Sequence, residues 1–513
     1  MSTGDIPLAS SFDKKNGQGV LNYHTGDDGV EDGVKHPYVA YRSRWYVIAT
    51  LAALNFSNAM AWICFAAITN ITAVYYNVTP DDVNWLSLIY LIVTVPFGFL
   101  ASWVLDTFGI RTGMLIGSWV NLLGIILRFF STLPAVPEDS RFTVVMCGQG
   151  LAALAQPFLL FTPTKLAAVW FPDNQRAFAN TLGSMSHPLG ILASFLLSSL
   201  IVSKPADIPT MLWVYTIPAA VACAMCTLGV CQSAPPTPPS ASAAGDHETF
   251  LAGLQKCIEN LPFMLLMLTF GGGYGLFNGL STFLEQIVCP IGYNDNFAGL
   301  VGGLMIAFGL VGAVASGLIV DRTKAFTPVT KISFTFAVLF GIVMTVFTHF
   351  AYMGIGVAVG AIGFGLFGFA LFPIALELGV ECTYPVAEGT SAGLLQISGQ
   401  FQGIILILVG QYLAQPLNID EVPAQQCIPV DGPQSEVTMT PLTFADNVTY
   451  MSTMETTESM STNETTESTP IYIQHMTVPM YVFCGYALVS CLLLVIFFKT
   501  RYRRIEAEQG AKE

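Results

Sequence analysis

Long apolar runs recur along almost the whole chain, and short polar segments separate them. Each run has about 20 residues, the length of helix that crosses ~30 Å of hydrocarbon. Runs this continuous favour helices, because membrane-barrel strands alternate apolar and polar residues over about 10 positions. The pattern therefore predicts twelve membrane-spanning helices, over residues 45–68, 84–105, 113–133, 142–163, 178–202, 210–231, 261–284, 298–320, 330–350, 353–377, 390–413 and 477–498.

The predicted helices form two sets of six, because the polar stretch CQSAPPTPPSASAAGDHET follows the sixth. Pro, Ser and Ala without periodicity are typical of a flexible linker. The halves also share a motif, GFLASWVLD in the first and ASGLIVD in the second. Parallel repeats of this kind are typical of transporters whose site lies between the repeats. We therefore predict an all-α membrane protein of two six-helix bundles, divided into a disordered cytoplasmic N-terminus 1–40, a first bundle 41–231, a cytoplasmic linker 232–258, a second bundle 259–500 and a cytoplasmic tail 501–513.

The composition excludes an ordinary soluble protein, because only 11% of the residues are charged and 53% are hydrophobic. Soluble domains have about 25% charged residues. Much of the net charge of −14 comes from residues 414–475, which hold nine acidic residues and no Lys or Arg. This segment is rich in Ser, Thr, Met and Glu, and we predict a disordered outer loop there. Basic residues flank the opposite helix ends, so the positive-inside rule places both termini in the cytoplasm.

The predicted outer loop contains two sequons, NVT at Asn447 and NET at Asn463. Both are far enough from the membrane to be glycosylated, and an unmodified loop is the alternative. Of the eleven cysteines, only Cys289 and Cys427 fall in predicted outer loops. An oxidising compartment favours a disulfide between them.

Charged residues follow the apolar runs at matching places in the two halves. WVLDTFGIRTG places Asp106 and Arg111 after the second run, and GLIVDRTK places Asp321 and Arg322 after the eighth. An aspartate there can face the N-terminus of a neighbouring helix and pair with an arginine, in only one arrangement of the bundles. We therefore predict a conformational latch. The alternative is ordinary loop charges that obey the positive-inside rule.

Repeat symmetry suggests partners for these charges. Asp321 is predicted to pair with Arg176 in the outward-facing state. The equivalent of Arg176 in the other half is Gly389, so Asp106 is expected to rely on the dipole of the eleventh predicted helix. Glu388 is then the candidate partner of Arg111.

Several motifs resemble known transporters. GLIVDRTK and the degenerate LDTFGIR are similar to the loop motif of the major facilitator superfamily. Within it, WLSLIYLIVTVPFGFLASWVLD, KLAAVWFPDNQRA and STFLEQI resemble the feline leukemia virus subgroup C receptor family, also called solute carrier family 49. The resemblance implies a central cavity lined by helices 1, 5, 7 and 11. It also implies transport of choline or ethanolamine, with heme proposed for some relatives.

Two residues match the family's substrate positions. Trp62 matches its first-helix aromatic residue and Gln400 its eleventh-helix glutamine. The family's seventh-helix tyrosine appears here as Asn278, next to Phe277, and we predict that both residues contact the solute. A tryptophan face attracts a quaternary ammonium group by about 0.5–2 kcal/mol, which suits choline.

The fifth-helix glutamine of the family falls on Pro188, next to His187. Alignment of the two halves sets His187 opposite Gln400, and polar groups at midplane depth indicate a substrate site. The alternatives are that Trp62 is an interfacial packing residue and that His187 makes a helix–helix hydrogen bond. Arg128, near the outer end of the third predicted helix, is expected to snorkel or to pair structurally.

No GxSxG, HExxH or phosphate-binding loop is present, so we predict no enzymatic activity. No metal, cofactor or nucleic acid partner is expected. Glu285 and Glu377 lie close to helix ends, and this favours facilitated uniport over proton coupling. The sequence thus predicts a monomeric transporter of a choline-like or other small amphipathic or cationic solute, in a plasma membrane rather than an endolysosomal one. A carrier of heme or another organic solute, and a non-transporting receptor or scaffold, remain as alternatives.

Overall fold

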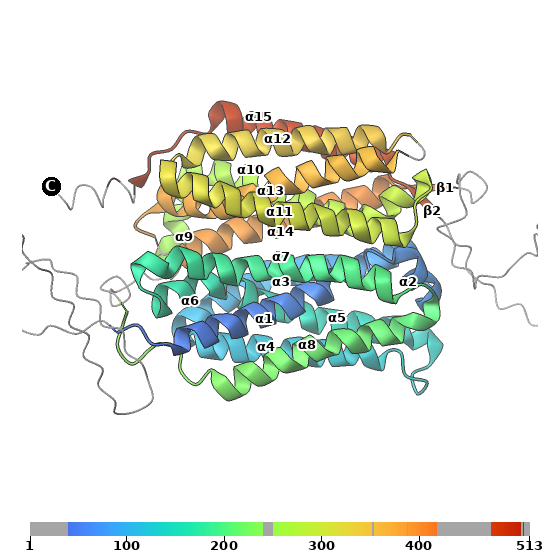
Figure 1. The fold of residues 1–513 in the computed structure, drawn as a ribbon, viewed down its shortest axis with the longest axis horizontal. Coiled ribbons are helices and arrows are strands. Elements are labelled where there is room, and N and C mark those ends of the chain that lie inside the picture. The colour runs from blue at the N-terminus through green and yellow to red at the C-terminus, as the bar shows by residue number, and fades with distance from the viewer. Residues whose placement is uncertain are drawn as a thin grey trace, which may run out of the picture.

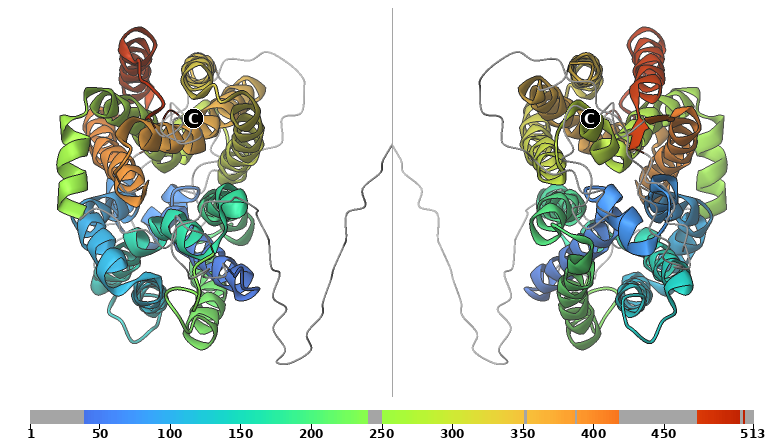
Figure 2. Two further views of the ribbon diagram at one scale, coloured as in Figure 1. Left: turned by 90° about the vertical axis from the view of Figure 1, so that its left-hand side faces the viewer. Right: turned by 90° about the vertical axis from the view of Figure 1, so that its right-hand side faces the viewer.

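The computed structural model describes residues 39–239, 250–350, 353–386, 388–417, 473–503 and 506. Twelve helices in these residues are long and apolar enough to cross a membrane. They form two six-helix bundles stacked side by side, with their axes roughly aligned (Figures 1 and 2). The predicted fold class is confirmed.

The first bundle contains the following elements: α1 (Ser43–Ile63), α2 (Thr69–Tyr76), α3 (Pro80–Phe108), α4 (Ile110–Phe130), α5 (Glu138–Leu160), α6 (Thr162–Trp170), α7 (Asp173–Ile201), η1 (Pro205–Asp207) and α8 (Ile208–Gly229). The second contains α9 (Phe250–Glu259), α10 (Leu261–Val288), η2 (Cys289–Ile291), α11 (Asp295–Thr323), α12 (Phe326–Phe347), α13 (Gly354–Thr383), α14 (Glu388–Leu413), β1 (Gln415–Leu417), β2 (Ile473–His475) and α15 (Thr477–Phe497).

We call the two ends of the molecule the strand end and the terminal end, after the elements that lie there (Figure 1). The strand end carries α2 and the ribbon of β1 and β2. The terminal end carries the start of α1 and the end of α15. The ribbon is antiparallel and pairs Gln415 with His475, so the two edges of the segment predicted to be disordered are ordered. Similarly, α9 occupies part of the predicted linker.

The first predicted helix is interrupted, because α1 ends at Ile63 instead of residue 68. The backbone oxygen of Ala61 accepts hydrogen bonds from Arg128 Nη1 and Gln149 Nε2, both at 3.1 Å. Arg128 Nη2 also donates to Cys64 Sγ at 2.7 Å. A cation that binds free carbonyls stabilises a helix C-terminus. Of the two alternatives expected for Arg128, the structure therefore supports structural pairing and not snorkelling, since the side chain is 0% exposed inside the bundle.

Helices α11 and α13 approach each other closely through glycines. A Cβ atom on Gly312 would lie 1.8 Å from the backbone oxygen of Leu366, and one on Gly365 would lie 1.9 Å from that of Met305. Small residues at such crossings let helix backbones approach in a membrane. This contact fixes α13, which forms one wall of the site described below.

We predict that Gly312→Ala lowers the melting temperature of the purified protein. The added methyl group overlaps a backbone oxygen, and overpacking costs about 1–3 kcal/mol. Gly317→Ala on the same helix is the matched control, because a Cβ there meets no atom within 4 Å and alanine has the higher helix propensity. Equal melting temperatures for the two variants would contradict the close approach.

Candidate substrate chamber and gate

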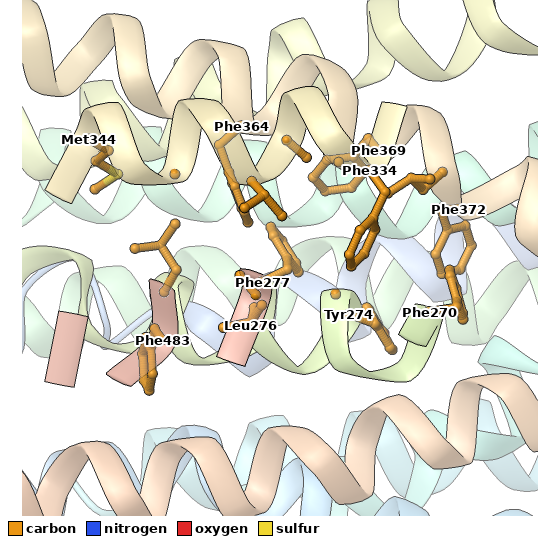
Figure 3. A pocket seen from close by; sticks show the side chains of 18 of the residues that line it. Phe270, Tyr274, Leu276, Phe277, Phe334, Met344, Phe364, Phe369, Phe372 and Phe483 are labelled. Carbon is orange, nitrogen blue, oxygen red and sulfur yellow. The ribbon is translucent and has the colours of Figure 1, made fainter. Parts of the chain in front are cut away.

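A chamber lies between helices α10, α12, α13 and α15 of the second bundle and reaches α7 and the end of α5 in the first. The chamber is open on one side, and its empty volume of about 1210 Å³ includes solvent space at that opening. Its lining includes eight aromatic side chains, all of them labelled in Figure 3: Phe270, Tyr274, Phe277, Phe334, Phe364, Phe369, Phe372 and Phe483.

The aromatic side chains pack against one another around the space. Tyr274 and Phe270 lie on one face of α10, and their ring centroids are 5.8 and 6.0 Å from that of Phe372 on α13. Phe277 meets Phe369 edge to face, with a centroid distance of 4.9 Å and an interplanar angle of 81°. Residues 270, 274 and 277 share a face because they are spaced four and three positions apart. The wall therefore presents both ring faces and ring edges to the space.

His187 lies at the side of the chamber nearest the first bundle. Its ring is 5% exposed, and its Nε2 atom has no hydrogen-bond partner. Trp62 lies against it, with ring centroids 6.1 Å apart, and its Nε1 donates to the backbone oxygen of Ser87 at 3.2 Å. The structure thus brings two predicted site residues together. Only His187 lines the chamber, since Trp62 is 2% exposed and does not contribute to the lining.

Asn278 and Gln400 form a second polar group. Asn278 Nδ2 donates to Gln400 Oε1 at 3.4 Å, and Gln400 Nε2 donates to the Tyr274 hydroxyl at 3.4 Å. Of these three, only Tyr274 lines the chamber. Sequence reasoning missed Tyr274, although it lies one helical turn before Asn278, on the same face of α10. Phe277 was predicted, and it does line the chamber.

Asp106, which we predicted to interact with a helix dipole, has a different partner in the structure. Asp106 Oδ1 accepts a short hydrogen bond from Lys165 Nζ, which also donates to the backbone oxygen of Leu105 at 2.7 Å. Lys165 reaches this position because α6 continues α5 after a bend next to Phe161. Asp106 is therefore paired within the first bundle.

The other predicted latch residues are only partly described. Arg176 Nη2 donates to the backbone oxygen of Ala168 at 3.2 Å. Arg111 and Arg322 are exposed. The side chains of Asp321 and Glu388 lie outside the described residues, so the pairs Asp321–Arg176 and Arg111–Glu388 stay predictions.

Cys289 is disulfide-bonded, and the other cysteines in the described residues are free. Its predicted partner Cys427 and the sequons at Asn447 and Asn463 lie outside the described residues. The specific pairing and the glycosylation therefore stay predictions.

Hydrogen bonds donated by amide side chains join the two bundles at the strand end. Gln286 Nε2 of α10 donates to Asn84 Oδ1 of α3 at 2.7 Å, and Asn84 Nδ2 returns a bond of 3.4 Å. Asn70 Nδ2 of α2 donates to Glu285 Oε1 at 2.5 Å. Gln411 Nε2 of α14 donates to the backbone oxygen of Asp81 at 3.1 Å. We call these contacts the strand-end gate, because they hold the bundles together at that end.

We predict that Gln286→Leu opens the strand-end gate. Loss of one partner leaves buried Asn84 unpaired, which costs about 1–3 kcal/mol and shifts a two-state equilibrium by about five-fold or more. The reporter is Ser281→Cys on α10, where the native side chain is fully buried. Its reaction with a membrane-impermeant maleimide should accelerate by that factor.

The labelling is done in a chain whose exposed Cys147 and Cys231 are replaced by serine. Gln255→Leu on α9, at the terminal end, is the matched control and should leave the rate unchanged. Equal labelling rates for Gln286→Leu and Gln255→Leu would mean that the hydrogen bonds between Asn84 and Gln286 do not hold the gate closed.

Two six-helix bundles with a chamber lined by both of them are typical of membrane transporters. The sequence profile of the Major Facilitator Superfamily matches residues 51–407. Solute carrier family 49 member A3 of Xenopus tropicalis is 43% identical over 416 residues, which are 80% of this chain and 86% of that protein. The choline/ethanolamine transporter FLVCR1 of Felis catus is 31% identical over 74% of this chain and 69% of its own length. The chain belongs to the Major Facilitator Superfamily and, within it, to solute carrier family 49.

Solved structures agree with this fold. A D-xylose-proton symporter matches with a TM-score of 0.57 and 12% identity, over 71% of this chain and 88% of its own. A nucleoside transporter, NupG, matches with a TM-score of 0.56 and 12% identity, over 88% of this chain and 100% of its own.

Proposed function

We propose that this transporter carries a small amphipathic, cationic solute by facilitated uniport, with His187 and the chamber aromatics as its binding site. The observation that carries the proposal is the buried, unpartnered Nε2 atom of His187 in a chamber walled by aromatic rings. A buried polar atom without a partner is costly, so a solute that hydrogen-bonds to it gains affinity. In either tautomer of the imidazole, Nε2 offers one hydrogen-bonding group, as a donor or as an acceptor.

The aromatic, uncharged lining of the chamber favours a cationic solute. The residues that line the chamber include no Asp, Glu, Lys or Arg. Ring faces attract cations through their quadrupole and need no carboxylate, which suits an alkylated ammonium group. The choline/ethanolamine transporters among the relatives support the same class of solute.

Alternating access supplies the transport step. The basic residues that flank the helices put the terminal end in the cytoplasm, so the strand-end gate closes the outer side of the membrane. Opening of this gate and closure at the terminal end would expose the chamber outward. In the present conformation Trp62 is covered, and we expect it to contact the solute once the bundles have moved.

We predict that Trp62→Leu weakens choline uptake more than Trp62→Phe does. Leucine keeps apolar bulk but removes the ring face, whose attraction of about 0.5–2 kcal/mol corresponds to about 2- to 30-fold. The measurement is radiolabelled choline uptake by proteoliposomes. Trp119→Leu, on an exposed surface of α4, is the control for loss of a tryptophan. Equal uptake by wild type and Trp62→Leu, for a solute that the wild type carries, would place the site elsewhere.

Uniport predicts that carboxylates do not drive transport. Glu285 is 1% exposed, but it lies in the strand-end gate and not in the chamber lining. Glu285→Gln keeps the acceptor for Asn70 and removes a titratable proton. Choline counterflow should therefore persist in Glu285→Gln, and a pH gradient should not accumulate choline in wild type or variant. Gradient-driven accumulation that disappears in Glu285→Gln would establish proton coupling instead.

A further inference from the structure

The chamber continues far from the interface between the bundles. Helices α12 and α15 lie on the side of the second bundle that is remote from the first (Figures 1 and 2). Nevertheless, Val338 and Met344 of α12 and Met480 and Phe483 of α15 line the space. The chamber therefore extends from His187 through the interior of the second bundle toward its outer helices.

The polarity of the lining changes along this path. Near the first bundle, His187 offers an unpartnered nitrogen. Near the outer helices, Thr345 donates to the backbone oxygen of Gly341 at 3.0 Å and lies 3.1 Å from Cys484 Sγ. These polar atoms are thus satisfied within the protein, and the remaining surface there is aliphatic and aromatic. The distal part of the chamber suits an apolar group.

Gly368 on α13 borders open space. It lines the chamber, and a Cβ atom there would meet no atom within 4 Å. By contrast, a Cβ on Gly365, one turn earlier, would meet backbone at 1.9 Å. A side chain added at position 368 would therefore enter the chamber without displacing backbone.

We propose that the distal chamber binds an alkyl or aryl tail of the transported solute, several carbons long, while the polar head lies at His187. The placement of the head rests on the proposed function, and the placement of the tail rests on the chamber itself. Burial of each methylene contributes about four-fold in affinity. The solute that binds most tightly is then an amphiphile whose tail is longer than that of choline.

The test measures dissociation constants in lipid nanodiscs for tetramethylammonium and for butyl-, hexyl- and octyl-trimethylammonium. For the wild type, the constant should fall about four-fold per methylene until the chamber is filled. Gly368→Leu should abolish this dependence and leave tetramethylammonium binding unchanged. Gly485→Leu is the matched control, because Gly485 is exposed on α15 and a Cβ there also meets no atom within 4 Å. It should retain the wild-type dependence.

Uncharged 1-butanol, 1-hexanol and 1-octanol separate the tail from the head. If the affinity for the alcohols increases with chain length and Gly368→Leu abolishes this increase, the tail site is supported. This holds even if none of the ammonium compounds binds, a result that would refute the proposal of a cationic solute. Tetramethylammonium binding without length dependence overturns the tail site and leaves the proposed function standing. An equal dependence of affinity on chain length in wild type and Gly368→Leu also overturns the tail site. If Gly368→Leu does not fold, Gly368→Ala is measured instead, and its affinity should stop rising at a chain about one methylene shorter than in the wild type. The same limiting chain length in both proteins overturns the proposal.

Discussion

Hydrocarbon offers no partner to a polar group, so a polar atom inside these bundles must find one within the protein or await a ligand. Arg128 and Gln149 illustrate the first outcome, because they bind the carbonyl groups left free where α1 ends. His187 illustrates the second, because its Nε2 atom is buried and unpartnered at the chamber. The same constraint thus builds the interrupted first helix and marks the candidate site.

The two bundles meet this constraint differently. In the first, Asn58 donates to Asn121 at 2.9 Å, and Asn121 donates to Ser57 at 3.2 Å. Such linked hydrogen bonds specify one arrangement of helices. In the second, aromatic side chains surround the chamber. Most of the chamber lining therefore comes from the second bundle, although the helices of the two bundles correspond by repeat.

The contacts between the bundles are suited to opening. Amide hydrogen bonds such as Asn84–Gln286 contribute about 1 kcal/mol each, since water replaces them when they break. The ion pair of Asp106 with Lys165 lies within one bundle, so a rigid rotation of the bundles leaves it intact. It joins α6 to α3. A conformational latch must instead be sought among contacts that cross between the bundles, as the strand-end gate does.

The sequence by itself determined the twelve helices and their division into two sets, because the thickness of the hydrocarbon fixes the length of each apolar run. It also singled out His187, whose polarity stands out in an apolar run. Only the tertiary structure decided that α1 ends at Ile63, because the donors that cap it come from α4 and α5. Likewise, no pattern in α12 or α15 revealed that Val338 and Phe483 line a chamber. A face that contacts lipid and a face that lines an apolar chamber have the same composition, and only the packing of the helices distinguishes them.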